Sequence, residues 1–181
     1  MADQQLARLA SIARHTLTFV RPNSPKGPTK VEAVAESVVA MFRPRCHSGG
    51  SELRLLRTVD AWVAVPADDL RQILTNLVSN ACDALVGGDG LVEIEISAEK
   101  EWAVIQVRDN GSGIAPENAG RIFDAFFSTK EGVGTGIGLW VTKELVEKSG
   151  GRISIQSGDG RGFRTTFRVE FPLIEAAVPA G

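Results

Sequence analysis

Four glycines at alternate positions, Gly132, Gly134, Gly136 and Gly138, stand directly before a segment of helical periodicity, Leu139 to Lys148. Glycine is unfavourable inside helices and strands, so these residues are expected to form a loop that ends at a helix N-terminus. Backbone N–H groups in such a loop can surround an anion, and the helix dipole adds favourable charge. The pattern is neither a Walker loop nor a Rossmann turn. We interpret it as a phosphate cradle, with a flexible loop as the alternative.

The rest of the chain alternates between helical and strand-like periodicity. Apolar residues at spacings of three and four predict helices, and strict alternation predicts strands. The predicted helices cover residues 29–45, 69–86 (capped by Asp68), 116–124 and 139–148, and the predicted strands cover 53–55, 62–65, 91–98, 102–108, 152–157 and 163–171. This order predicts an α/β fold, a two-layer sandwich in which a mixed, mostly antiparallel sheet carries helices on one face.

The firmest boundary in the sequence lies near residues 21–28, where three prolines in seven residues cannot continue a helix. Before it, an apolar stripe at helical spacing predicts one amphipathic or coiled-coil helix: Leu6, Leu9, Ala13, Leu17 and Val20. We therefore divide the chain into residues 1–28, a helix with its proline-rich linker, residues 29–175, the main domain, and residues 176–181, a frayed tail.

Composition excludes several classes of protein. With 20 Lys and Arg against 22 Asp and Glu, the net charge of −2 gives no general attraction to nucleic acid or anionic lipid. Cys46 and Cys82 show neither zinc-site spacing nor the density of a disulfide scaffold. No apolar run is long enough for a membrane span, and the N-terminus lacks signal-peptide features. We expect a cytoplasmic chain, although a longer parent protein could be membrane-anchored.

The predicted helix 69–86 carries polar residues at one helical spacing. Asn76, Asn80 and Asp83 stand at positions i, i+4 and i+7 and therefore share one stripe. Neutral asparagine carbonyls at this spacing could bind a hard cation such as Mg²⁺ beside phosphates. The alternative is an ordinary solvated polar face.

Two further segments carry polar groups beside glycine or aromatic residues. Asp109-Asn110-Gly111-Ser112-Gly113 follows a predicted strand, where a carboxylate could accept a hydrogen bond from the exocyclic amine of adenine. A simple turn is the alternative. Residues 122–130 place Phe126, Phe127 and Lys130 ahead of the cradle. We expect both phenylalanines to be local core residues, and Lys130 is placed to reach a γ-phosphate.

Taken together and in this order, the four segments resemble the N, G1, F and G2 boxes of sensor histidine kinases, within the ATPase superfamily that includes gyrase and the heat-shock chaperones. The motifs Asn-x₃-Asn, Asp-x-Gly-x-Gly, Phe-Phe-Ser-Thr-Lys and Gly-Thr-Gly-Ile-Gly-Leu occur with family-like separations. The resemblance runs from about Thr29 to Pro172. It implies the histidine kinase ATPase fold, ATP and Mg²⁺ as cofactors, and transfer of the γ-phosphoryl group to a histidine.

The resemblance also implies roles for individual residues. Asn80 would bind Mg²⁺, Asn76 would face the phosphates, and Asp109 would accept from the adenine amine, with Gly113 against the base. Asn76, Asn80 and Lys130 would form the catalytic set, with Lys130 in a mobile lid that is shorter than is usual in the family. Thr166 would support Asp109 through water, and Thr135, Gly136 and Gly138 would hold the phosphates. The remaining nucleotide-binding positions would be Asp83, Gly111, Ile114, Gly134, Ile137 and Leu139.

By the same resemblance, the N-terminal helix looks like the second helix of a dimerisation and phosphotransfer hairpin. His15 is followed by Thr16 and not by an acidic residue, so we expect it to be a surface or packing residue and the phosphoacceptor helix to be absent. The implied partners are that helix, a response regulator and a second copy of the chain.

Two other functions compete with histidine phosphorylation. One is an ATP-dependent regulatory binding module, such as an anti-sigma factor. The other is a gyrase-type ATP-hydrolysing machine, which places a glutamate where this chain has Asn76. The predicted helix 69–86 contains no glutamate, which favours transfer to a protein acceptor over rapid hydrolysis.

Overall fold

The computed structural model describes residues 27–57, 59–129, 135–158 and 162–175. In chain order its elements are β1 (Thr29–Lys30), α2 (Val31–Ser48), β2 (Glu52–Arg57), β3 (Trp62–Val63), α3 (Ala67–Ala84), β4 (Leu91–Glu99), β5 (Trp102–Asp109), α4 (Pro116–Ala119), α5 (Gly138–Lys148), β6 (Arg152–Ser157) and β7 (Thr165–Pro172). The expected N-terminal helix with His15, part of the lid and the tail lie outside the described residues. No helix within the described ranges is long and apolar enough to cross a membrane.

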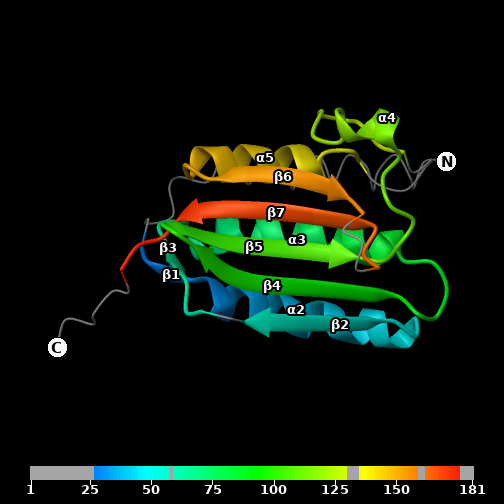
Figure 1. Cartoon of the computed structure of the whole chain (residues 1–181), viewed down its shortest axis with the longest axis horizontal. Helices are drawn as coiled ribbons and strands as arrows, with labels where there is room; N and C mark the ends of the chain where they lie inside the picture. Colours follow the sequence, from blue (N-terminus) through cyan, green and yellow to red (C-terminus); the bar gives the residue numbers. More distant parts are fainter. Residues whose placement is uncertain (1–26, 58, 130–134, 159–161, 176–181) are drawn as a thin grey trace, which may run out of the picture.

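Five strands form one sheet in the order β2-β4-β5-β7-β6 (Figure 1). The β2–β4 pair is parallel and the other neighbours are antiparallel, while β1 and β3 form a separate two-stranded pair. In the view of Figure 1, α2 and α3 lie behind the sheet, and α3 packs against both α2 and α5. The predicted fold class, a mixed, mostly antiparallel sheet with helices on one face, is confirmed.

The core lies between the sheet and this helical layer. Alternate residues of β5 and β7 face it in register, with Ile105 opposite Val169 and Val107 opposite Phe167. The helices contribute side chains at spacings of three and four, and in α3 these are Leu70, Ile73, Leu74, Leu77 and Ala81. Burial of each large aliphatic side chain contributes about 1.5–3 kcal/mol relative to its exposed state. The core therefore fixes one face of α3 against the sheet.

Several element boundaries differ from the prediction; for example, the helix predicted over 69–86 runs from Ala67 to Ala84. Thr29 and Lys30 are paired with β3, so α2 begins at Val31 and not at residue 29. The expected cap by Asp68 is wrong, because α3 begins at Ala67 with no side-chain cap, and Asp68 lies in its first turn. There its carboxylate pairs with Arg71 at 2.6 Å. The helix predicted over 116–124 ends at Ala119 and continues as turns.

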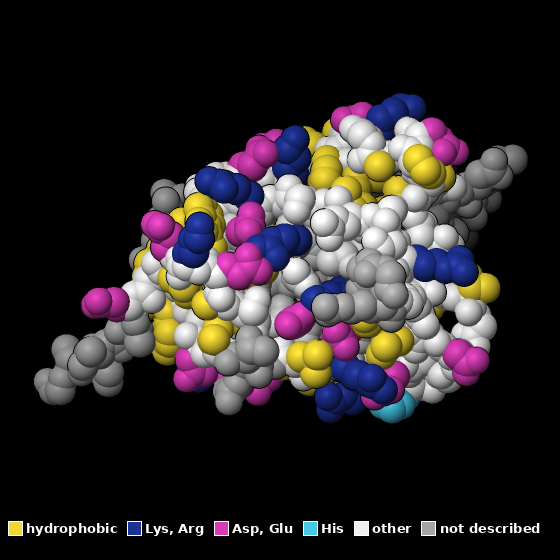
Figure 2. Space-filling model, in the orientation of Figure 1, with side chains coloured by type: hydrophobic (Ala, Val, Ile, Leu, Met, Phe, Trp, Pro, Cys, Tyr) yellow, Lys and Arg dark blue, Asp and Glu magenta, His cyan; other side chains and the backbone are white. Residues whose placement is uncertain are grey.

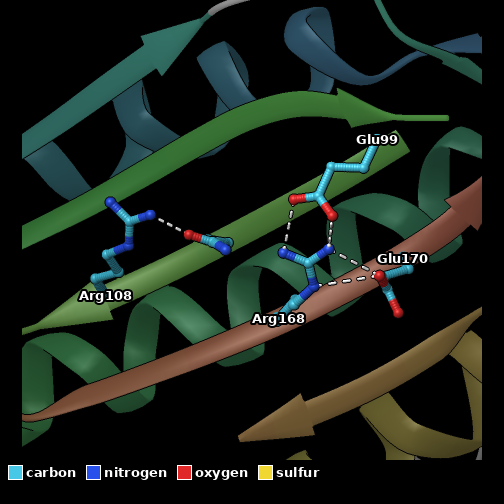
Figure 3. A network of polar contacts seen from close by, with 5 residues as sticks. Glu99, Arg108, Arg168 and Glu170 are labelled. Carbon is cyan, nitrogen blue, oxygen red and sulfur yellow. Dashed lines mark hydrogen bonds and ion pairs between the residues drawn. The ribbon is translucent and has the colours of Figure 1, made fainter. Parts of the chain in front are cut away.

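The other face of the sheet is open and carries charged side chains of both signs (Figure 2). Arg168 binds the carboxylates of Glu99 at 2.6 Å and Glu170 at 2.9 Å (Figure 3). Arg108, on β5, binds Glu93 at 3.0 Å and also pairs with Glu95. Because acidic and basic groups neutralise each other in these clusters, this face presents no single sign of charge around them.

Candidate functional site

The polar stripe of α3 divides between two neighbouring helices. Asn76 is only 9% exposed, and its Nδ2 donates to the carbonyl of Gly138 at 3.0 Å and to Oγ1 of Thr142 at 3.2 Å. Asn80 follows one turn later and is half-buried. Asp83 pairs instead with Arg45 of α2. The structure therefore brings Asn76 to the predicted cradle, while the charge of Asp83 is balanced by the helix on the other side.

Asp109 ends β5 and is almost completely buried, with 2% of its surface exposed. Its Oδ1 accepts hydrogen bonds from the backbone N–H of Gly111 at 3.0 Å and from Oγ1 of Thr165 at 3.3 Å. Its backbone carbonyl accepts from the N–H of Arg164 at 2.8 Å. These contacts fix the position of a buried carboxylate at the end of a central strand.

Thr165, and not Thr166, is the threonine that contacts this carboxylate directly. Thr165 lies opposite Asp109 in the β5–β7 register, whereas Thr166 lies opposite Arg108. Successive strand residues point to opposite faces, so Thr166 shares the open face with Arg108. The expected support of Asp109 by Thr166 through water does not fit this arrangement. Strand parity is the signal that could have identified Thr165.

The loop after Asp109 packs tightly against the C-terminus of α3. A Cβ on Gly111 would lie 2.6 Å from the carbonyl carbon of Ala84, so only glycine fits there. The N–H of Ser112 donates to the Ala84 carbonyl at 2.9 Å. Gly113 has a left-handed φ of +76°, and Ile114 packs against the core. These contacts hold Gly111 and Ser112 against the C-terminus of α3.

Asn110, in the same loop, has a structural role that the sequence analysis does not predict. Its Oδ1 accepts from the N–H of Leu91 at 2.7 Å, and its Nδ2 donates to the carbonyl of Asp89 at 3.0 Å. The amide thus ties the loop to the start of β4. Asparagine is frequent in turns because its side chain can bond to backbone groups, which is the signal that could have found it.

The cradle segment is held by the turn that precedes it in the sequence. Gly136 has φ +67°, and a Cβ there would lie 2.7 Å from the carbonyl oxygen of Phe127. The N–H of Phe126 donates to the Gly136 carbonyl at 3.0 Å. Phe126 itself is 69% exposed and has a left-handed φ of +67°, so its expected place in a local core is wrong. Phe127 does pack against the core.

The remaining cradle residues lie at the start of α5. Ile137 is buried, Leu139 packs against the core, and Thr135 is half-buried. Gly138 is the first residue of α5, whose first N–H groups have no partner within the helix. Lys130 and Gly134 lie outside the described residues, so their predicted roles stay predictions.

Two cysteines far apart in the sequence meet between α2 and α3. Sγ of Cys46 in α2 lies 3.1 Å from Sγ of Cys82 in α3. Burial, with a further contribution from the hydrogen bond to Cys46, raises the pKa of the Cys82 thiol to about 12. At neutral pH Cys82 is therefore an uncharged packing residue and not a nucleophile.

A surface hollow of about 470 Å³ lies elsewhere, between α2 and the edge strand β2. It is lined by Arg43, His47 and residues 52–56. None of the predicted nucleotide-binding residues is among them.

Comparison with known proteins assigns the segment that carries these motifs to a family. Residues 66–174 match the family of histidine kinase-, DNA gyrase B-, and HSP90-like ATPases. The chain is 43% identical over 188 residues to the two-component sensor PprA of Pseudomonas aeruginosa. This alignment covers 99% of this chain and 20% of PprA. The chain is 33% identical over 186 residues to the sensor histidine kinase AruS of the same species, covering 91% of this chain and 18% of that protein.

Solved structures give the same result. Full-length ShkA in complex with AMPPNP superposes with a TM-score of 0.79 at 28% identity, covering 94% of this chain and 37% of ShkA. The mycobacterial sensor histidine kinase MprB superposes with a TM-score of 0.73 at 23% identity, covering 83% of this chain and 99% of that structure, and this shows the fold alone. The chain spans about a fifth of the length of the two curated relatives above. The match over residues 66–174 shows that this chain belongs to the histidine kinase-, DNA gyrase B- and HSP90-like ATPases, and its similarity to the sensor kinases above identifies it as an ATPase domain of the histidine kinase type.

Proposed function

We propose that this chain binds Mg-ATP beside α3 and that, in a longer parent protein, it transfers the γ-phosphoryl group to a histidine on a phosphoacceptor helix for relay to a response regulator. The proposal includes a cytoplasmic location and association of two copies through the N-terminal segment. The observation that carries it is the buried carboxylate of Asp109, which is fixed by Gly111 and Thr165 in a loop that packs on α3.

Asp109 supports adenine as the base. A carboxylate only accepts hydrogen bonds, and adenine presents an exocyclic amine, which is a donor. Guanine presents a carbonyl oxygen at the same ring position, so two acceptors would face each other. Gly113 adds backbone without a side chain two residues beyond Gly111, which suits close approach to a base.

The C-terminal half of α3 suits the phosphates and a metal ion. Asn76 contacts Gly138 at the start of α5, and Asn80 lies one turn further on with a half-buried neutral amide. Mg²⁺ in nucleotide sites takes few protein ligands, with phosphates and water supplying the rest, so the donor set on α3 fits it. Asn80 would hold the ion, which when bound would neutralise phosphate charge. Thr135, Gly136 and Gly138 would hold the phosphates.

The acid–base chemistry also favours transfer over hydrolysis. Helix α3 contains no glutamate, and Asn76 cannot act as a base to orient water. Phosphoryl transfer depends mainly on positioning and charge neutralisation, so amides, backbone N–H groups, a metal ion and Lys130 would suffice.

The test has two parts. In competition binding, ATP should displace a fluorescent ATP analogue at least tenfold better than GTP, and Asp109→Asn should reduce this preference while keeping the fold, because its amide oxygen can still accept from Gly111. In the second part, labelled ATP is incubated with the chain and a separately supplied phosphoacceptor hairpin. Acid-labile label on the hairpin histidine is expected, and His15→Gln should not change it. Tight ATP binding without any label would instead favour an ATP-dependent binding module.

A further inference from the structure

Both N–H groups and the oxygen of the Asn76 amide are hydrogen-bonded to protein neighbours. Its two N–H groups donate to the Gly138 carbonyl at 3.0 Å and to Oγ1 of Thr142 at 3.2 Å. Its Oδ1 accepts from Nε2 of Gln72 at 2.9 Å, one turn earlier in α3. With 9% of the residue exposed, the side chain points into the boundary between α3 and α5.

One backbone carbonyl determines the direction of every bond in this cluster. The Gly138 carbonyl can only accept, so the Asn76 nitrogen must face it and the Asn76 oxygen must face Gln72. Gln72 therefore has to present its NH₂ group. Thr142 donates its own hydroxyl hydrogen to the same Gly138 carbonyl at 2.8 Å, which leaves its oxygen to accept from Asn76.

The common partner, Gly138, is the first residue of α5. The first N–H groups of this helix are the ones proposed to hold phosphate, so their position relative to α3 depends on what holds Gly138. Two hydrogen bonds to its carbonyl, from α3 and from the next turn of α5, provide that attachment. Thr142 is completely buried on the face of α5 that otherwise carries Val141, Leu145 and Val146.

We propose that Gln72 and Thr142 are positioning residues that hold Asn76 turned inward as a tether between α3 and the phosphate cradle, so that Asn76 acts through Gly138 and not by direct contact with phosphate. The inference rests on the proposed function, because it concerns the phosphate end of the same site. It differs from the role expected for Asn76 from the family resemblance.

The test compares binding of Mg-ATP with binding of adenosine. Thr142→Val removes the hydroxyl at similar volume, and Gln72→Met removes the amide at similar length. Each should weaken ATP binding about tenfold, the scale of one lost hydrogen bond, while adenosine binding stays within about twofold. Thr142→Ser keeps the hydroxyl and should restore ATP binding. Thr75→Val, which removes a threonine hydroxyl from a half-buried residue of α3, is the matched control and should leave ATP binding unchanged.

The possible outcomes distinguish failure of the tether from failure of the proposed function. Unchanged ATP affinity in both Thr142→Val and Gln72→Met would overturn the tether while leaving the proposed function intact. Equal losses for ATP and adenosine, with a lower urea midpoint, would also overturn it, because they would indicate general loosening of the fold. An unmutated chain that binds neither ligand would overturn the proposed function and the tether together.

Discussion

Gly111 and Gly136 both approach another backbone too closely for a Cβ, but the backbones that they approach differ. Gly111 lies against the Ala84 carbonyl at the C-terminus of α3, next to the buried Asp109. Gly136 lies against residues 126 and 127, in a turn whose Phe126 side chain is 69% exposed. At Gly111 the proposed base end of the site is thus tied to the folded core, whereas at Gly136 the proposed phosphate end is tied to a turn with an exposed side chain.

This difference predicts how each end responds to change. Contacts within the core transmit strain because protein interiors are close-packed, so a change at Gly111 should cost global stability. Surface segments open at low free energy, so a change at Gly136 should affect ligand binding more than unfolding.

The largest expected effect is that of Gly111→Ala. The new Cβ would overlap the Ala84 carbonyl carbon at 2.6 Å, and neither backbone is free to move because Ser112 is bonded to the same carbonyl. We expect the free energy of unfolding to fall by about 3 kcal/mol. Urea unfolding measures this, with Gly120→Ala as the control, since nothing lies within 4 Å of a Cβ there. A loss as small as that of the control would show that the base end is not rigid.

The next largest effect is expected for Asn80→Ala, which should change only the proposed phosphate end of the site. Removal of the amide should weaken binding of ATP in Mg²⁺ by roughly 1–3 kcal/mol, because a group that faces a charge is lost. Without Mg²⁺, mutant and parent should bind ATP with the same affinity, and adenosine should be unaffected. Calorimetric titration with and without the metal measures both. Equal affinity in Mg²⁺ would remove Asn80 from the metal site.

Gly136→Ala should separate function from stability. The substitution forces a φ of +67° on alanine and overlaps the Phe127 carbonyl oxygen, so residues 126–127 and the cradle must shift relative to each other. We expect a stability loss of about 1 kcal/mol and an ATP affinity about tenfold lower. Gly158→Ala is the matched control, since it imposes a φ of +71° with nothing within 4 Å. If Gly136→Ala unfolds the chain as Gly111→Ala does, the two ends are equally part of the core.

Local sequence patterns could predict some features of the fold and the site but not others. Local periodicity determines α3 and β5, so the positions of Asn76, Asn80 and Asp109 on their elements followed from spacing. The parallel pairing of β2 with β4 joins strands that local patterns cannot relate, since it depends on how α3 crosses between them. The Asp68 cap failed because Pro66 is the N-cap, so the helix starts at Ala67, two residues earlier than the capping pattern suggests.

Side-chain orientation was the other limit. Thr165 and Thr166 are chemically identical neighbours, so only strand parity distinguishes them, and the β5–β7 register shows that Thr165 faces Asp109. Asn76 belongs to a motif that predicts a ligand, but its engagement by Gln72 and Thr142 depends on how α5 packs on α3. Phe126 is aromatic and was therefore expected in a core, yet its φ of +67° turns it outward.

Glu99→Gln should have the smallest effect and should leave both ends of the site unchanged. Glu99 lies on the open face, where Arg168 binds it with both Nη atoms at 3.0 and 2.6 Å. The hydrogen bond from Arg168 lowers the pKa of Glu99 below its ordinary value. The folded state therefore favours the ionised form, and this stabilisation is present above the ordinary pKa and is lost as pH falls through the lowered value.

Because the Glu99 side chain is 58% exposed, solvent screening limits the contribution to about 0.5 kcal/mol at pH 7. Urea unfolding of the parent and the variant from pH 7 down to pH 3 should show a difference that shrinks as the carboxylate is protonated. ATP affinity should be the same in both at pH 7, because this cluster contacts neither Asp109 nor Gly138. A difference in unfolding that persists at pH 3 would mean that packing, and not charge, is lost. A change in ATP affinity would mean that the open face of the sheet is coupled to the proposed ATP site.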